Sequence, residues 1–169
     1  MYSLSNFKLL VEKQEEIDAI YQNCDELKKT TVAPKISSEV DHFFECSKNH
    51  LESQGFNVTV TTSKLKAQYK EAFITIDKHS KDLEECIFIN LNNYVEDQLS
   101  IMLDIESQQS QQIITYNKDG FTKALEQVND KLNRAKNLQN ACRATKLIYK
   151  NNQNNIFHSA NEAINYYFK

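Results

Sequence analysis

The hydrophobic pattern at the start of the chain is helical. Between Phe7 and Leu27, apolar side chains return every three or four positions, and acidic residues stand between them. This spacing is the period of an amphipathic α-helix. Thr30 and Thr31 interrupt the pattern, so we expect the first helix to end near residue 27.

A second amphipathic helix is predicted beyond Pro34, which disfavours continuation of the first one. Ser38 followed three residues later by Asp41 is typical of a helix N-cap. Gly55 stands where a C-terminal cap is expected. The side chains predicted to be buried on this helix are Ile36, Val40, Phe43, Phe44, Ser47 and Leu51.

After Gly55 the pattern changes to alternation. Residues 56–62 alternate apolar with polar side chains and are rich in β-branched types, which predicts a strand. Four later segments have the same character, namely residues 72–77, 86–91, 99–105 and 112–116. Polar stretches separate them, so we expect an antiparallel meander.

Helical spacing can also be found across residues 63–105, for example at Leu65, Tyr69, Phe73 and Ile76. An uncapped helix of about forty residues would be far longer than the average helix, and β-branched residues concentrate in this region. Strands are therefore preferred. An all-α bundle is the alternative fold.

The most regular helical pattern follows Gly120. Its apolar residues are Phe121, Leu125, Val128, Leu132, Ala135, Cys142 and Tyr149. A helix of about thirty residues extends about 45 Å, so part of it is expected to pack on a partner. A short last helix is predicted over residues 159–168, after an asparagine-rich break at 151–155.

These elements predict an α+β fold in one domain. Two helices occupy residues 1–54, a central antiparallel sheet of about four to five strands occupies 55–117, and 118–169 holds the C-terminal helices, the longer of which covers one sheet face. The length of 169 residues is enough for one domain with its own hydrophobic core.

The glycine count excludes several enzyme classes. Dinucleotide-binding, Walker and nucleophile-elbow motifs each require clustered or paired glycines, whereas the chain has only Gly55 and Gly120. We predict no catalytic residue and no cofactor. The longest apolar run is residues 86–89, and the four cysteines form no CxxC pair. A cytoplasmic protein with reduced thiols and no membrane partner is therefore expected.

Two constellations could hold a metal ion. His42, Cys46 and His50 follow one another at intervals of four on the second predicted helix. The first and third lie about 12 Å apart by helical rise, so only two of them could share an ion. A half-exposed helix face, with Cys46 toward the core, is the preferred interpretation.

Asp77, Asp104 and Glu106 could converge on a divalent cation at strand ends, as in a small metal-dependent enzyme such as a nuclease. Asp104 lacks the lysine in register that such sites usually add. Solvent-facing acids are the preferred interpretation, and no metal site is predicted.

Charge is distributed unevenly. Residues 121–169 contain eight Lys or Arg and three Asp or Glu, in a chain with a net charge of −3. A nucleic-acid-binding protein is thus one alternative, using the basic side chains Lys131, Arg134, Arg143 and Lys146. Solubilising lysines, or charge matching with the acidic N-terminal helices, explain the same pattern without a ligand.

The preferred functional hypothesis is a non-enzymatic protein–protein interaction module, such as an adaptor, inhibitor or assembly subunit. Its long C-terminal helix has a heptad-like apolar seam, typical of coiled-coil-like association. The aromatic end of the chain can anchor an interface. The residues expected to contact a protein partner or a second copy are Phe121, Leu125, Val128, Leu132, Tyr166, Tyr167 and Phe168.

Overall fold

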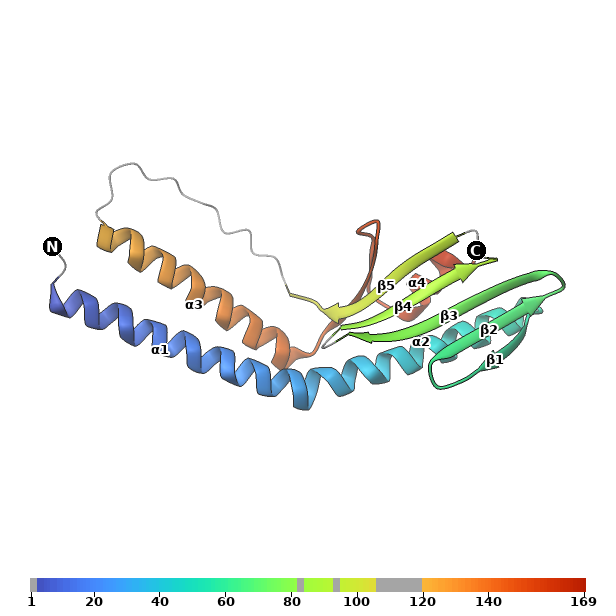
Figure 1. The fold of residues 1–169 in the computed structure, drawn as a ribbon, viewed down its shortest axis with the longest axis horizontal. Helices are drawn as coiled ribbons and strands as arrows, with labels where there is room; N and C mark the ends of the chain where they lie inside the picture. Colours follow the sequence, from blue (N-terminus) through green and yellow to red (C-terminus); the bar gives the residue numbers. More distant parts are fainter. Residues whose placement is uncertain (1–2, 82–83, 93–94, 106–119) are drawn as a thin grey trace. The chain divides into compact units, whose positions relative to one another are not determined.

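The computed structural model describes residues 3–81, 84–92, 95–105 and 120–169 (Figure 1). The chain divides into two compact units. The first, called the helical unit, comprises Met1–Thr31 and Ile105–Ala144. The second, called the sheet unit, comprises Val32–Asp104 and Thr145–Lys169.

The helical unit pairs two helices that are far apart in the sequence, α1 (Leu4–Leu27) and α3 (Gly120–Ala144). Glu16 forms an ion pair of 2.9 Å with Lys136, and further along Gln139 donates a hydrogen bond of 2.9 Å to Asn23. Later residues of α1 thus meet later residues of α3. The two helices therefore run side by side in the same direction (Figure 1).

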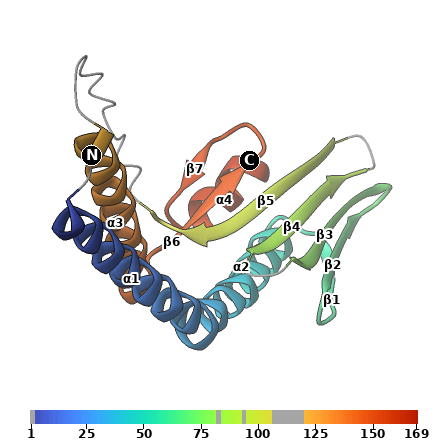
Figure 2. The same ribbon diagram turned by 60° about the vertical axis from the view of Figure 1, so that its left-hand side comes forward.

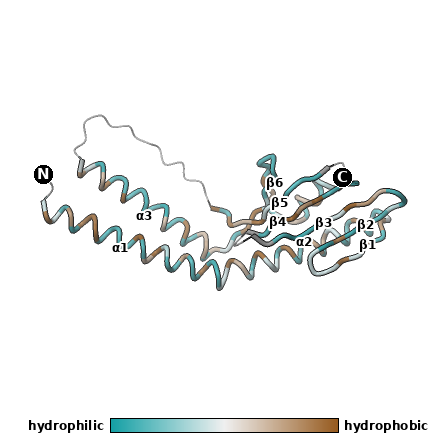
Figure 3. The backbone as a smooth tube through the Cα atoms, in the orientation of Figure 1, coloured by the Kyte–Doolittle hydropathy of each residue, from teal (hydrophilic) through white to brown (hydrophobic). Residues whose placement is uncertain are grey.

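Apolar spacing on both helices builds the contact between them. Ile17, Leu132 and Ala135 form a buried cluster, against which Ile20 and Val128 pack. Figure 3 shows hydrophobic and hydrophilic residues alternating along both helices, as expected for amphipathic helices. Part of the apolar seam predicted on the long C-terminal helix thus packs against α1 of the same chain.

The thiols of Cys24 and Cys142 are completely buried near the ends of α1 and α3. Burial raises the pKa of both thiols. Both cysteines are free, and each therefore behaves as a small apolar side chain at neutral pH.

Between α1 and α2 (Ala33–Ser53) the chain forms a π-helical turn, η1 (Lys28–Val32), so no loop separates the two predicted helices. Ser38 is not an N-cap, because α2 begins earlier and Ser38 lies inside it. Pro34 occupies the first turn of α2, where its missing N–H group is not needed.

The predicted C-terminal cap of α2 is confirmed. Gly55 has φ +85°, and its N–H group donates to the carbonyl of Glu52. The N–H group of Phe56 donates to the carbonyl of Leu51, which completes a Schellman motif.

The sheet unit contains an antiparallel sheet of seven strands that are neighbours in chain order. The α+β class and the meander are confirmed, and the all-α alternative is wrong. The strands are β1 (Asn57–Val60), β2 (Lys64–Tyr69), β3 (Ala72–Lys81), β4 (Glu84–Leu91), β5 (Val95–Leu103), β6 (Leu147–Asn151) and β7 (Ile156–Phe157). The strand predicted over 112–116 lies outside the described residues.

Sequence reasoning missed β2, β6 and β7. Residues of β6 were assigned to the long helix because Tyr149 falls on its spacing, but α3 ends at Ala144. Thr145 has φ +48°, a left-handed conformation that stops the helix and leads into β6. The sheet therefore has more strands than the four to five predicted.

The helices that contact the sheet strands are α2 and the short α4 (Ala160–Tyr167) (Figure 2). Within the sheet unit α2 supplies the cover that was predicted for the long C-terminal helix, and within the helical unit α3 packs with α1. The strand residues fully or almost fully buried in the sheet core are Leu65, Ala67, Ile76, Ile87, Ile89, Leu99, Ile101 and Tyr149.

Tyr149 connects β6 to α2. Its ring lies 5.8 Å from that of Phe43, and its hydroxyl donates a hydrogen bond of 2.6 Å to Glu39. Burial, together with the bond to Glu39, raises the pKa of Tyr149 far above its ordinary value. The phenol therefore keeps its proton at pH values where an ordinary tyrosine ionises.

Candidate functional site

The predicted partner-binding residues of α3 lie in the helical unit. Leu132 is buried against Ile17, and Val128 packs beside it. Leu125 and Phe121, about one and two turns before Val128 in the same seam, are half-buried. Much of the apolar surface predicted for a partner is thus already covered by α1.

The aromatic end of the chain packs on its own unit. The Tyr167 hydroxyl donates to Asp97 over 2.8 Å, and the Tyr166 ring lies 5.2 Å from Phe157. His50 donates from Nε2 to the carbonyl of Phe168 over 2.9 Å. These contacts place Tyr166, Tyr167 and Phe168 around the sheet unit's own core, with Tyr166 the most exposed of the three.

The four basic residues considered for nucleic acid do not form one row. Lys131, Arg134 and Arg143 belong to α3, where Arg134 and Arg143 lie on opposite sides because nine residues are two and a half turns. Lys146 belongs to the sheet unit and forms an ion pair of 2.6 Å with Asp104.

The candidate metal ligands are also separated. Cys46 lies 3.5 Å from Nε2 of His42, but His50 is engaged by Phe168. Burial raises the pKa of the Cys46 thiol, which opposes formation of a metal-binding thiolate. Across the described ranges, no group of three or more His, Cys, Asp or Glu side chains is arranged to hold a metal ion.

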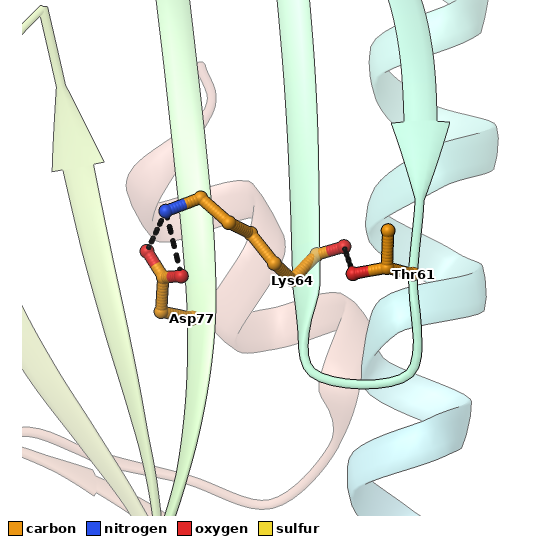
Figure 4. A network of polar contacts seen from close by, with 3 residues as sticks. All are labelled: Thr61, Lys64 and Asp77. Carbon is orange, nitrogen blue, oxygen red and sulfur yellow. Dashed lines mark hydrogen bonds and ion pairs between the residues drawn. The ribbon is translucent and has the colours of Figure 1, made fainter.

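Asp77 and Asp104 are each paired with a different lysine. Lys64 places its amine 2.8 Å and 3.1 Å from the two carboxylate oxygens of Asp77, and Thr61 donates to the Lys64 carbonyl (Figure 4). Glu106 lies outside the described residues. The predicted acidic triad is therefore not assembled by the two acids that the structure describes.

The outer face of the sheet carries a shallow hollow that sequence reasoning did not identify. It measures about 750 Å³, crosses β2, β3 and β4, and is also lined by Glu96 of β5. His79 packs edge-on against Phe88, with ring centroids 4.9 Å apart. Positive and negative side chains both line it, including Lys66 and Glu96. In the predicted strands, polar residues alternate with apolar ones, and this alternation is the sequence signal that could have identified the polar outer face.

A second unpredicted feature is an exposed apolar row on α1. Leu4, Phe7 and Val11 are 82%, 62% and 41% exposed, and they follow one another at intervals of three and four. Ile17 and Cys24, which face α3, are buried. In the sequence Phe7 and Val11 belong to the same apolar pattern as Ile17 and Cys24, whereas in the structure only Ile17 and Cys24 are buried.

Comparisons with family models, curated proteins and solved structures found no match to the chain. Within the described residues, no helix is both long enough and apolar enough to cross a membrane. The surfaces themselves are therefore the basis for a functional proposal.

Proposed function

We propose that this chain is a non-enzymatic protein-interaction module that associates with a second copy of itself through the helical unit. The observation that carries the proposal is the apolar row of Leu4, Phe7 and Val11 on α1. Large apolar side chains gain about 1.5–3 kcal/mol each when they are fully buried. A row of three such side chains at helical spacing can therefore pack against the apolar side chains of another helix.

Charge supports a second copy as the partner. α1 has two lysines against six acidic residues, whereas α3 has five basic residues against two acidic ones. In a two-fold dimer of such helix pairs, the acidic α1 of one copy can lie beside the basic α3 of the other. The same patch then serves both subunits.

The proposal refines the sequence hypothesis in one respect. Of the predicted contact residues on α3, Leu132 and Val128 pack against α1, so in this proposal α1 supplies the central apolar contacts and α3 supplies the charges. Phe121 and Leu125, near the start of α3, are half-buried.

The test is light scattering on the Phe7→Asp variant. The unmodified protein should be dimeric at high concentration, and Phe7→Asp should be monomeric with an unchanged circular dichroism spectrum. Ile156→Asp is the matched control, because Ile156 is 51% exposed, against 62% for Phe7, but lies on β7 of the sheet unit. A monomeric unmodified protein, or a Phe7→Asp variant that still dimerises, would refute the proposal.

A further inference from the structure

The sheet has an open edge at β1. In the strand order β1 is the first strand, and its only neighbour in the described sheet is β2 (Figure 2). An edge strand presents unpaired N–H and C=O groups to its surroundings.

The hydrogen-bond pattern identifies them. The N–H group of Thr61 donates to the carbonyl of Lys64 over 2.8 Å, so these two residues form a hydrogen-bonded pair. Such pairs alternate along an antiparallel ladder, and the next one is therefore Thr59 with Lys66. Val58 and Val60 consequently direct their backbone N–H and C=O groups away from the sheet.

The β1 edge is short, but it carries none of the charges, prolines or bulges that commonly block strand addition. Natural edges are commonly protected by lysine, proline, bulges or inward-pointing charges. The four residues of β1 are Asn57, Val58, Thr59 and Val60, which are all uncharged, and their register with β2 is regular. The edge is therefore geometrically able to pair with another extended chain.

A groove of about 340 Å³ lies beside this edge, between the end of β1 and α2. Phe44 and Val60 supply its apolar surface, and Asp41 and Glu45, one helical turn apart, supply negative charge. Lys48 also lines the groove, but its amine lies 3.9 Å from Glu52, the next acid along α2. The acidic pair thus remains available to a cation from outside.

We infer that the β1 edge binds an extended segment of a partner protein, which adds as a further strand beside β1. The residue opposite Val60 would point to the same face as Val60 and place its side chain in the groove. An apolar residue fits there, and a neighbouring Lys or Arg would meet Asp41 and Glu45. This edge belongs to the sheet unit, and the inference does not depend on association through α1.

The experiment selects ligands for the full-length protein from a phage-displayed library of random heptapeptides. The expected winners alternate apolar and polar residues and carry a Lys or Arg. The consensus peptide is then synthesised with a fluorescent label, and its affinity is measured by anisotropy. Recovery of no peptide, or of peptides with helical spacing or acidic character, would overturn the inference.

Two variants test the mode of binding. Val58→Pro removes an outward N–H group without removing a bond to β2, since proline is tolerated on the free side of an edge strand. It should weaken the peptide about tenfold, as expected for the loss of a buried backbone hydrogen bond. Val58→Thr retains the N–H group and is the matched control. Equal weakening by both variants would contradict strand addition.

Asp41→Lys combined with Glu45→Lys tests the acidic pair. The double variant should weaken the consensus peptide and improve binding of a peptide whose basic residue is replaced by glutamate. Unchanged affinity for both peptides would contradict the assigned position of the basic residue. If instead Val58→Pro abolishes dimerisation of the chain, the occupant of the edge is a second copy and the inference is overturned.

Discussion

The helical unit and the sheet unit differ in how completely they bury their apolar side chains. In the sheet unit, α2 covers a face whose strand residues are almost completely buried, among them Ile76, Ile87 and Ile101. In the helical unit, the buried cluster is small, a glutamine at position 139 occupies the seam, and five large apolar residues of α1 are exposed, among them Leu4, Phe7 and Val11.

This difference indicates where stability and association originate. A large, well-covered core supplies most of the hydrophobic free energy of folding, because the gain scales with the apolar area removed from water. A helix pair with a narrow contact and uncovered apolar residues has surface left for a partner. We therefore expect changes in the sheet core to unfold the protein, and changes on α1 to affect assembly.

The largest expected effect comes from Phe43→Ala. Phe43 of α2 is completely buried, and its ring packs against that of Tyr149. Loss of its ring should lower the free energy of unfolding by about 3–5 kcal/mol. Urea denaturation followed by circular dichroism measures the change. Phe73→Ala, on the outer face of the sheet, is the matched control and should cost less than half as much.

Leu132→Asp should have the next largest effect, and it acts on the other unit. Leu132 is buried against Ile17, so the variant places a carboxylate in the contact between α1 and α3. We expect a loss of about 2–4 kcal/mol, since an unpaired buried charge is poorly solvated. A variant that dissociates copies without any loss of helix content would show that Leu132 contacts a partner, as the sequence alone suggested.

Alkaline pH should destabilise the sheet unit through Tyr149. The folded protein keeps this phenol protonated, because its pKa is raised by burial, whereas the unfolded chain loses the proton near pH 10. The contribution of Tyr149 to the free energy of unfolding is therefore fully present below pH 10. It decreases by about 1.4 kcal/mol per pH unit as the pH rises further. Tyr149→Phe should make the decline shallower. An unchanged slope in denaturation midpoints between pH 9 and 11.5 would contradict the assignment.

The smallest expected effect is that of Gly55→Ala. Gly55 has φ +85° in the cap of α2, where any other residue is strained. An added Cβ would lie 3.8 Å from the Tyr69 ring, an ordinary contact, so the cost is conformational and about 1 kcal/mol. Gly120→Ala is the control. Thermal unfolding should show a lower midpoint for the first variant and little change for the second.

Local patterns predicted several elements of the fold. Apolar alternation located β1, β3, β4 and part of β5, and the helical period located most of α1, α2, α3 and α4. β2 was missed because only Leu65 and Ala67 face the core between lysine and glutamine side chains. β6 was missed because a few residues after α3 continued the helical spacing by coincidence.

The candidate surfaces were harder to predict because they depend on contacts between distant segments. Nothing local indicates that α3 pairs with α1, and that pairing decides that Leu132 is buried while Phe7 is exposed. Likewise, β1 is an edge only because the strands follow one another in chain order. The alternation of residues 56–62 predicts the strand but not its free side.

The most direct test of the central claim is sedimentation velocity of the unmodified protein over a hundredfold range of concentration. Association through α1 predicts a mass that rises with concentration from 19.7 kDa to twice that value, and Phe7→Asp should hold it at the lower one. A constant mass of one chain at every concentration would contradict the account.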